Sequence, residues 1–237
     1  MATQLEPAEF DRIAGELDIL GPEAILAWAV GAYHPRIVAS CSFGGASGMV
    51  IVDMLQRLGG AVPIVYLDTD LLFDETYALV DRIAERYGIE PIAIRPAQTV
   101  AEQAATHGDA LWARDPARCC GLRKVAPQRE FLRGYDAWIT GIRRDQSPAR
   151  AATPVVQWDA QFGLAKINPL ASWDEPMVWR YITEHGVPVN PLLARGYASI
   201  GCTPCTRPIA PGEPARTGRW SGFAKTECGL HFTDTES

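Results

Sequence analysis

Short apolar runs alternate with amphipathic stretches along most of the chain. The apolar runs, rich in β-branched residues, cover residues 36–40, 63–67, 92–94, 137–140, 155–158 and 164–167. Apolar residues at helical spacing predict helices at about 6–20, 22–30, 49–55, 77–87, 100–105, 122–132 and 175–184. The first two form a leading helical pair. Strands that alternate with helices are typical of a mostly parallel sheet with right-handed connections, so we predict an α/β fold.

Three of the predicted strands end in glycine-rich or polar loops. The first leads into the stretch 42–45, the second into Asp68 and Thr69, and the fourth into Gly141 and Arg143. Ligands of parallel sheets bind beyond the carboxyl ends of the strands, so we expect these loops to surround one site. A glycine-rich loop before a helix can be a plain tight turn, or it can offer backbone N–H groups to an anion. No Gly-Lys-Ser/Thr follows it, which disfavours hydrolysis of the Walker type.

The composition is that of a folded protein with one sizeable domain. The chain has 237 residues, of which 47% are hydrophobic and 21% charged, and this excludes a disordered chain. We divide it into a nucleotide-binding α/β domain with the leading helical pair, residues 1–200, and a C-terminal segment, residues 201–237. No apolar run approaches the roughly 20 residues of a membrane span, and the N-terminus carries no signal-peptide pattern. We therefore expect a cytoplasmic protein that binds no membrane.

The charge is negative overall and positive in one stretch. The net charge of −6 opposes binding to nucleic acid. Between Arg114 and Arg150, however, nine basic residues face four acidic ones, a local excess of +5 that suits a small anionic ligand. Each basic residue could also be an ordinary solvated side chain. The candidate anion-binding cations are Lys124, Arg143, Arg144, Arg150, Arg216 and Arg219.

Six cysteines are present, and four of them form two close pairs. Thiols stay reduced in the cytoplasm, where close pairs indicate metal ligands before disulfides. Cys119 and Cys120 are adjacent, and Cys202 and Cys205 form a C-x-x-C pair. Four such thiols suit a structural zinc ion or an iron–sulfur cluster. We favour a [4Fe-4S] cluster, because adjacent cysteines fit one small tetrahedral ion poorly, whereas a cluster presents separate irons.

The remaining cysteines, Cys41 and Cys228, have different surroundings. Cys41 follows a predicted buried strand and is interpreted as a small core residue. Cys228 lies near the C-terminus among Arg216, Arg219 and Lys225. Nearby cations lower the pKa of a thiol and favour the nucleophilic thiolate. Cys228 is therefore either a nucleophile or a spare surface thiol.

Several motifs, in order from about residue 36 to residue 232, together resemble one enzyme family. They are Ser42-Phe43-Gly44, Leu67-Asp68-Thr69, Cys119-Cys120-Gly121-Leu122-Arg123-Lys124-Val125-Ala126-Pro127, Gly141-Ile142-Arg143-Arg144-Asp145-Gln146-Ser147-Pro148, the C-x-x-C pair and Glu227-Cys228-Gly229-Leu230-His231. This set is similar to the assimilatory sulfonucleotide reductases, and most similar to the bacterial adenylylsulfate (APS) reductases of iron–sulfur type. The resemblance implies a Rossmann-like fold of the adenine nucleotide alpha hydrolase, PP-loop type, with a flexible C-terminal tail.

The resemblance also implies a reaction and its residues. Cys228 would attack the sulfur of adenosine 5'-phosphosulfate, with His231 assisting, to release AMP and leave an S-sulfocysteine. A separate thioredoxin or glutaredoxin would then release sulfite. Lys124 could link a [4Fe-4S] cluster on Cys119, Cys120, Cys202 and Cys205 to the substrate. The nucleotide would contact the loop residues Ser42, Gly44, Gly45, Leu67, Asp68, Thr69 and Gly141.

Alternatives and departures from the family pattern remain. Asp70 stands where many relatives have glycine, and Ala46 and Ser47 stand where many have acidic residues, which affects the details of nucleotide contact. A phosphoadenosine phosphosulfate (PAPS) reductase shares the terminal motif, although the four paired cysteines point to APS. A PP-loop ATP pyrophosphatase of the tRNA-thiolation type and a module held by a four-cysteine zinc site are more distant alternatives. A homo-oligomer is possible.

Overall fold

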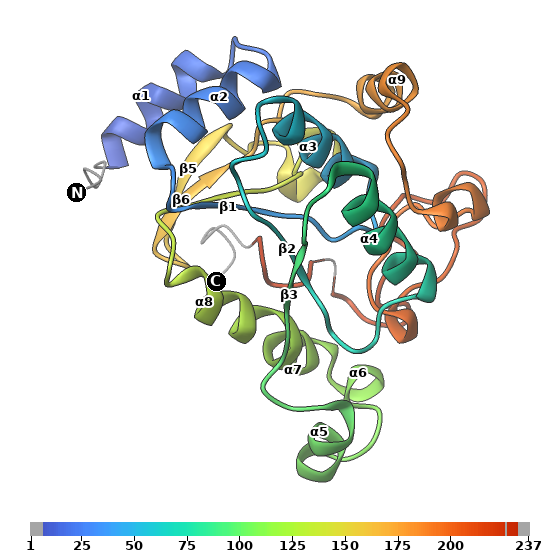
Figure 1. Ribbon diagram of the computed structural model, residues 1–237. Coiled ribbons are helices and arrows are strands. Elements are labelled where there is room, and N and C mark those ends of the chain that lie inside the picture. The colour runs from blue at the N-terminus through green and yellow to red at the C-terminus, as the bar shows by residue number, and fades with distance from the viewer. Residues whose placement is uncertain (1–6, 226, 232–237) are drawn as a thin grey trace.

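The structure, a computed structural model, describes residues 7–225 and 227–231 (Figure 1). The helices are α1 (Pro7–Leu17), α2 (Pro22–Tyr33), α3 (Ala46–Arg57), α4 (Asp74–Tyr87), α5 (Val100–His107), α6 (Leu111–Arg114), α7 (Pro116–Cys120), α8 (Ala126–Leu132) and α9 (Glu175–His185). The strands are β1 (Ile37–Ser40), β2 (Ile64–Leu67), β3 (Ile92–Ile94), β4 (Ala137–Ile139), β5 (Val156–Asp159) and β6 (Leu164–Ile167).

The six strands form one sheet in the order β3-β2-β1-β4-β6-β5. Neighbouring strands are parallel except β5 and β6, which form an antiparallel hairpin at one edge. The predicted mostly parallel sheet with flanking helices is therefore confirmed. The chain first builds outward from β1 to β3 and then adds β4 on the other side of β1. The ends of β1 and β4 thus flank a topological switch point, the usual ligand site of such sheets.

Alternate residues of the strands enter two different cores, one on each face of the sheet. The larger core packs the strands against α1, α2, α3, α4 and α9. The smaller core joins Val38, Val65 and Trp138 to Leu132 of α8, which runs along the opposite face (Figure 1). Trp138 pairs in register with Lys166 of β6, so both side chains belong to this second face. The described end of the chain packs on it too, because His231 stacks on Trp138.

One helical stretch begins earlier than the sequence pattern predicts. We predict a helix from about residue 122, but helical structure starts with α7 at Pro116, where the side chain of Asp115 accepts a hydrogen bond from the backbone N–H of Arg118. A π-helical turn, Gly121–Val125, then joins α7 to α8. Pro127 has no N–H for the carbonyl of Arg123, and its ring would crowd that carbonyl in a regular α-helix. The wider turn before it relieves this crowding.

After α9 the chain forms short 3-10 turns, Pro191–Arg195 and Thr203–Cys205, and little other regular structure. Residues 227–231, here called the tail segment, close the described part of the chain. The predicted tail flexibility and the boundary at residue 200 stay predictions, and residues 226 and 232–237 lie outside the described residues. Within the described ranges, none of the helices has the length and apolar character needed to cross a bilayer.

Candidate active site

A cavity of about 710 Å³ lies at the carboxyl ends of β1 and β4, at the switch point of the sheet. The predicted site residues that line it are Ser42, Gly45, Leu67, Lys124, Gly141, Arg143, Arg150, Arg216, Arg219, Cys228 and His231. The fold therefore brings together segments that are almost 190 residues apart, the loop after β1 and the tail segment. Four predicted substrate-binding residues lie outside the lining: Gly44, Asp68, Thr69 and Arg144.

The glycine-rich loop shapes one wall of the cavity. Helix α3 begins at Ala46 with Gly45 as its N-cap and with no side chain capping its first N–H groups, so the positive end of its dipole stays available to an anion. Gly44 instead packs against the chain, since a Cβ there would lie 2.8 Å from the carbonyl oxygen of Ile200. Gly141 lies equally close to the start of α3, because its Cβ would be 3.0 Å from the backbone nitrogen of Gly48.

The loop after β2 turns away from the cavity. The Asp68 carboxylate accepts a hydrogen bond from Tyr77 at 2.7 Å and pairs with Arg95 at 3.2 Å. The Thr69 hydroxyl lies 3.2 Å from the sulfur of Cys202. Asp70 adopts a left-handed conformation, with φ of 55°, that aspartate tolerates better than most residues.

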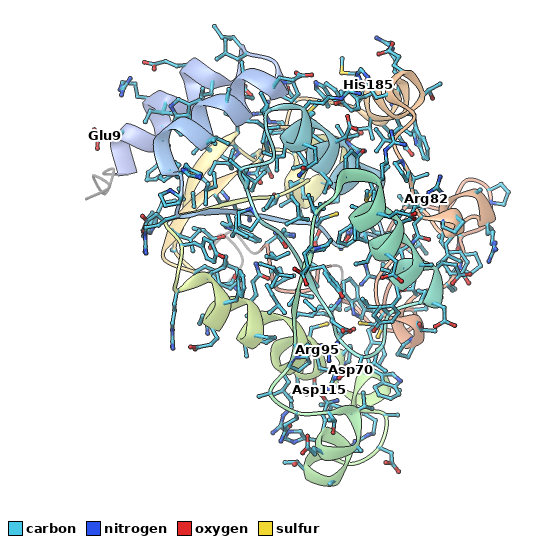
Figure 2. The ribbon with its side chains drawn as sticks, viewed as in Figure 1. Glu9, Asp70, Arg82, Arg95, Asp115 and His185 are labelled. Carbon is cyan, nitrogen blue, oxygen red and sulfur yellow. The ribbon has the colours of Figure 1, made fainter. Side chains whose placement is uncertain are left out.

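The departure at Asp70 has a structural reason in the buried guanidinium of Arg123. Arg123 donates to the Asp70 carboxylate at 2.6 Å and to the Thr69 carbonyl at 2.8 Å. Figure 2 shows Asp70 and Arg95 together on the α7 side of the molecule. The loop is thus tied to the α7 region. Arg123 lies in the double-cysteine motif, but no local feature of that motif distinguishes it from a surface arginine.

Two adjacent arginines after β4 point in different directions. Arg143 is buried, donates to Ser47 at the start of α3, and forms a bidentate pair with Asp145 at 2.8 and 3.1 Å. Arg144 instead pairs with Asp18 of the leading helical pair at 2.8 Å and donates to the carbonyl of Thr153. Its placement outside the cavity gives no support for the predicted substrate contact. Neighbouring positions in an irregular loop face different ways, and a basic pair in the sequence does not tell which one faces the site.

Arg150 and Arg216 share one carboxylate from the tail segment. Arg150 donates to both oxygens of Glu227, at 3.0 and 2.8 Å, and Arg216 donates to one of them at 3.0 Å. Burial in this group lowers the pKa of Arg216, although Glu227 opposes the shift. The predicted cations are present at the cavity, and a carboxylate holds two of them.

Lys124 and Arg219 are the other cations of the cavity, and both are buried. Among the ion pairs of the described residues, none joins either of them to a carboxylate. The guanidinium of Arg219 lies over the ring of Trp220, 4.4 Å from its centroid, and its Nε has no hydrogen-bond partner within the described ranges. Gly201 leaves room for it, since a Cβ there would stand 2.2 Å from the Arg219 Nη2. Buried cations without carboxylates fit an anion that comes from outside the chain.

Cys119, Cys120, Cys202 and Cys205, the cysteine wall, line one small void. Leu71, Trp112 and Trp220 give the void an apolar surface, and Lys124, Arg219 and Trp220 separate it from the large cavity because they line both. Burial raises the pKa of Cys119 and Cys120, and it raises the pKa of Cys205 to about 12. Cys202 differs: burial alone would raise its pKa, but Lys124 and the Thr69 hydroxyl lower it below its ordinary value.

The four thiols of the cysteine wall are a donor set that a [4Fe-4S] cluster can use, because they surround one void. Within residues 7–225 and 227–231, no three His, Cys, Asp or Glu side chains are close enough together to hold one metal ion. A [4Fe-4S] cluster takes one thiolate at each of four separate irons, so it needs its ligands around a common space rather than at one point. Four thiolates on such a cluster also form an anion, which Lys124 and Arg219 could neutralise. The residues fit this group.

Cys228 and His231 bring the tail segment to the cavity wall. Gln161, in the turn between β5 and β6, donates to the carbonyl of Gly229 at 2.8 Å. The His231 ring stacks on Trp138 with centroids 5.7 Å apart and an interplanar angle of 16°. Burial, followed by the charges of Lys166, Arg150 and Arg216, lowers the pKa of His231 well below its ordinary value, so the imidazole is neutral at pH 7.

Lys166 is a buried cation that the sequence pattern did not reveal. Its Nζ lies 5.3 Å from the Trp138 ring centroid and 3.8 Å from the carboxylate of Asp159. Burial lowers its pKa to about 8, although Asp159 opposes the shift. A lysine inside the run Leu164–Ile167 was the available signal, because lysine is almost never fully buried without a partner. Cys41, in contrast, is a core residue as expected: it is 2% exposed, and burial raises its pKa to about 12.

Residues 36–208 match the family described as the phosphoadenosine phosphosulfate reductase domain. Adenosine 5'-phosphosulfate reductase 1 of Bacillus subtilis is 47% identical over 212 residues, which cover 89% of this chain and 91% of that protein. Adenosine 5'-phosphosulfate reductase of Streptomyces coelicolor is 47% identical over 221 residues, which cover 93% of this chain and 92% of that one.

Solved structures give the same picture of the fold. Phosphoadenylyl-sulfate (PAPS) reductase from Candida auris, in a phosphate complex, matches with a TM-score of 0.77 and 34% identity over 87% of this chain and 100% of that chain. FMN adenylyltransferase from Candida glabrata matches with a TM-score of 0.57 at 19% identity, over 85% of this chain and 64% of that one, and shares the fold alone. The predicted Rossmann-like fold of the adenine nucleotide alpha hydrolase type is confirmed.

Proposed function

Because this chain belongs to the phosphoadenosine phosphosulfate reductase domain family, we propose that it reduces adenosine 5'-phosphosulfate to sulfite and AMP in sulfate assimilation. One observation carries the proposal beyond the family: the tail segment with Cys228 lines the same cavity as the α3 N-terminus and the cations Arg143, Arg150 and Arg216. A nucleophile and an anion site therefore share one space. We also propose a cytoplasmic location, where thiols stay reduced and four of the six cysteines can serve as cluster ligands.

The nucleotide would lie at the switch point, with its single 5'-phosphate near the first turn of α3. The N–H groups at this helix start and the charge of Arg143 support phosphate binding there. The phosphosulfate would extend toward Arg150, Arg216 and Arg219. These cations matter for rate, because the substrate and an attacking thiolate are both negative and must approach within bonding distance.

In the proposed reaction, the Cys228 thiolate attacks the sulfur of the phosphosulfate. An S–S bond forms, the sulfur–oxygen bond to the phosphate breaks, and AMP leaves with that electron pair. The product on the enzyme is an S-sulfocysteine. A thiolate of thioredoxin or glutaredoxin then attacks the Cys228 sulfur, and sulfite leaves. The partner's second thiol breaks the resulting mixed disulfide, which forms a disulfide within the partner and regenerates the Cys228 thiolate. Neutral His231, stacked on Trp138, orients the tail segment.

We further propose that the cysteine wall holds a [4Fe-4S] cluster. Its support is the convergence of four thiols on one apolar void, together with two buried cations that lack carboxylate partners among the described residues. When bound, such a cluster would join the two cysteine pairs and place charge beside the substrate cavity. Lys124 lines both spaces, so its side chain is in a position to respond to ligands in either.

Intact-mass spectrometry provides the central test. The enzyme is mixed with APS or with PAPS, each with and without reduced thioredoxin. We expect APS without thioredoxin to release about one AMP per active site and to add one SO3 unit on the peptide that contains Cys228. Thioredoxin should restore the mass and release sulfite. An adduct on another cysteine would refute the assigned nucleophile, and a higher kcat/KM with PAPS would refute the assigned substrate.

A further inference from the structure

Glu227 immediately precedes the proposed nucleophile and holds two cations of the cavity. Its carboxylate accepts a bidentate pair from Arg150 and a third hydrogen bond from Arg216. The side chains of Glu227, Arg150 and Arg216 are 11%, 12% and 19% exposed. An ion pair this shielded is screened much less than a surface pair, so it contributes to where the tail segment lies.

A carboxylate is also a small stand-in for the group that these arginines are proposed to bind. Guanidinium groups bind carboxylate and phosphate oxygens through the same forked, charge-assisted hydrogen bonds. The sulfonate and phosphate oxygens of a phosphosulfate present equivalent acceptors. In the structure, the Glu227 carboxylate thus pairs with the guanidinium groups of two arginines that line the cavity.

We infer that Glu227 is a displaceable internal ligand of Arg150 and Arg216: it holds Cys228 at the cavity wall until the substrate anion takes its place. The inference rests on the proposed function for the identity of that anion.

Donor geometry favours exchange over sharing. Glu227 takes the forked donors of Arg150, so a phosphosulfate oxygen can accept from the same donors only after the carboxylate leaves them. Two further contacts of the tail segment within the described residues are uncharged hydrogen-bond or ring contacts, the Gln161 bond to Gly229 and the stack of His231 on Trp138. These can keep the segment attached while Glu227 leaves, so that Cys228 moves relative to the bound anion.

The test compares the full-length protein with its Glu227→Gln variant, and ADP is the probe. ADP carries a terminal phosphate where APS carries sulfonate, and it offers no sulfur to attack. Cys228 labelling by iodoacetamide, mapped by peptide mass, measures how firmly the segment is held. Calorimetry measures ADP affinity. Glu130→Gln is the matched control, because it removes the same charge from an exposed pair with Arg133.

We expect Glu227→Gln to label Cys228 about ten-fold faster without nucleotide and to bind ADP about ten-fold more tightly, the scale of one charge-assisted hydrogen bond. Glu130→Gln should change neither, and Glu227→Asp should restore part of both. Unchanged labelling would overturn the holding role. Faster labelling with unchanged ADP affinity would overturn the exchange and leave the proposed function standing. Failure of both proteins to bind ADP would refute the nucleotide site, and with it the proposed function.

Discussion

The cysteine wall and the tail segment present thiols to the same small region, but they are built in opposite ways. The wall draws its thiols from α7 and from the later segment 202–205, and three of the four are buried. The tail segment is held by a carboxylate, one amide and one ring stack, and Cys228 is half-buried. The contrast fits the two proposed tasks: the thiols proposed to hold a cluster are set in an apolar wall, and the thiol proposed to meet substrate and reductant in turn is held by contacts that can exchange.

The largest expected effect comes from removing Cys228, the thiol of the tail segment. Cys228→Ser should fold and bind ADP, but form no adduct with APS and lose turnover to background, because a serine hydroxyl is far less nucleophilic than a thiolate. Intact mass and sulfite release measure the outcome. Cys41 lines the same cavity but is only 2% exposed, so Cys41→Ser tests whether the adduct depends on that thiol instead. Steady sulfite release by Cys228→Ser would refute the assignment.

Removing a thiol from the wall should instead cost structure and activity together. We expect Cys202→Ser to lose iron, visible colour and activity, and to expose the chain after residue 200 to proteolysis. Iron and sulfide analysis, absorbance and limited proteolysis report these effects separately. A colourless variant with full activity would show that the wall has no part in ordering the site. Bound zinc in the purified wild-type protein would contradict the cluster itself.

A smaller effect distinguishes the cations that face the cavity from those that do not. Lys124→Ala or Arg143→Ala should weaken APS binding or turnover by roughly 1.5 to 3 kcal/mol, the scale of a charged hydrogen bond. Arg144→Ala is the matched control, because Arg144 pairs with Asp18 outside the cavity. Steady-state kinetics with APS measure all three. Equal losses of APS binding or turnover for Arg143→Ala and Arg144→Ala would contradict the assignment of Arg143, and not Arg144, to the cavity lining.

The smallest expected effect is a pH dependence of the tail segment. The pKa of His231 in the packed segment lies below its unfolded value, so packing is fully favourable above about pH 6.5 and is weakened as the pH falls below it. Hydrogen exchange of residues 227–231, corrected for intrinsic rates, should therefore be faster at pH 5.5 than at pH 7.5. Lys166→Met removes a cation that lowers the pKa of His231. The pKa of His231 should therefore rise in this variant, and the difference in exchange rate between the two pH values should shrink. An unchanged difference in the variant would contradict the coupling.

The parallel sheet and its loops could be predicted from the sequence because their signals are local. Short apolar runs rich in β-branched residues and glycine-rich loops depend on a few neighbouring residues. The start of α7 was missed although its signals, Asp115 as N-cap and Pro116 at the first helical position, were also local. The apolar pattern from residue 122 onward was stronger and set the predicted boundary in the wrong place.

The site was predictable in its residue types but not in its pairings. No local sequence feature indicates that Arg143 donates to Ser47 whereas Arg144 pairs with Asp18, because these contacts depend on how distant elements pack. Lys166 was missed for a related reason: its burial follows from the tail segment packing on β4 and β6. Glu227 was visible in the terminal motif, but its partner Arg150 lies 77 positions earlier in the chain, so only the fold reveals the ion pair.

The π-helical turn between α7 and α8 amounts to one extra residue inserted into a helix. Each residue of an α-helix turns the chain by about 100°, so deletion of one residue from Gly121–Val125 would rotate Cys119 and Cys120 by that angle relative to the α8 residue Leu132. The helix could stay intact while its thiols no longer faced the void. Over evolutionary time, substitutions at the turn positions that do not serve the site, such as Leu122 and Val125, should therefore be tolerated better than changes in its length.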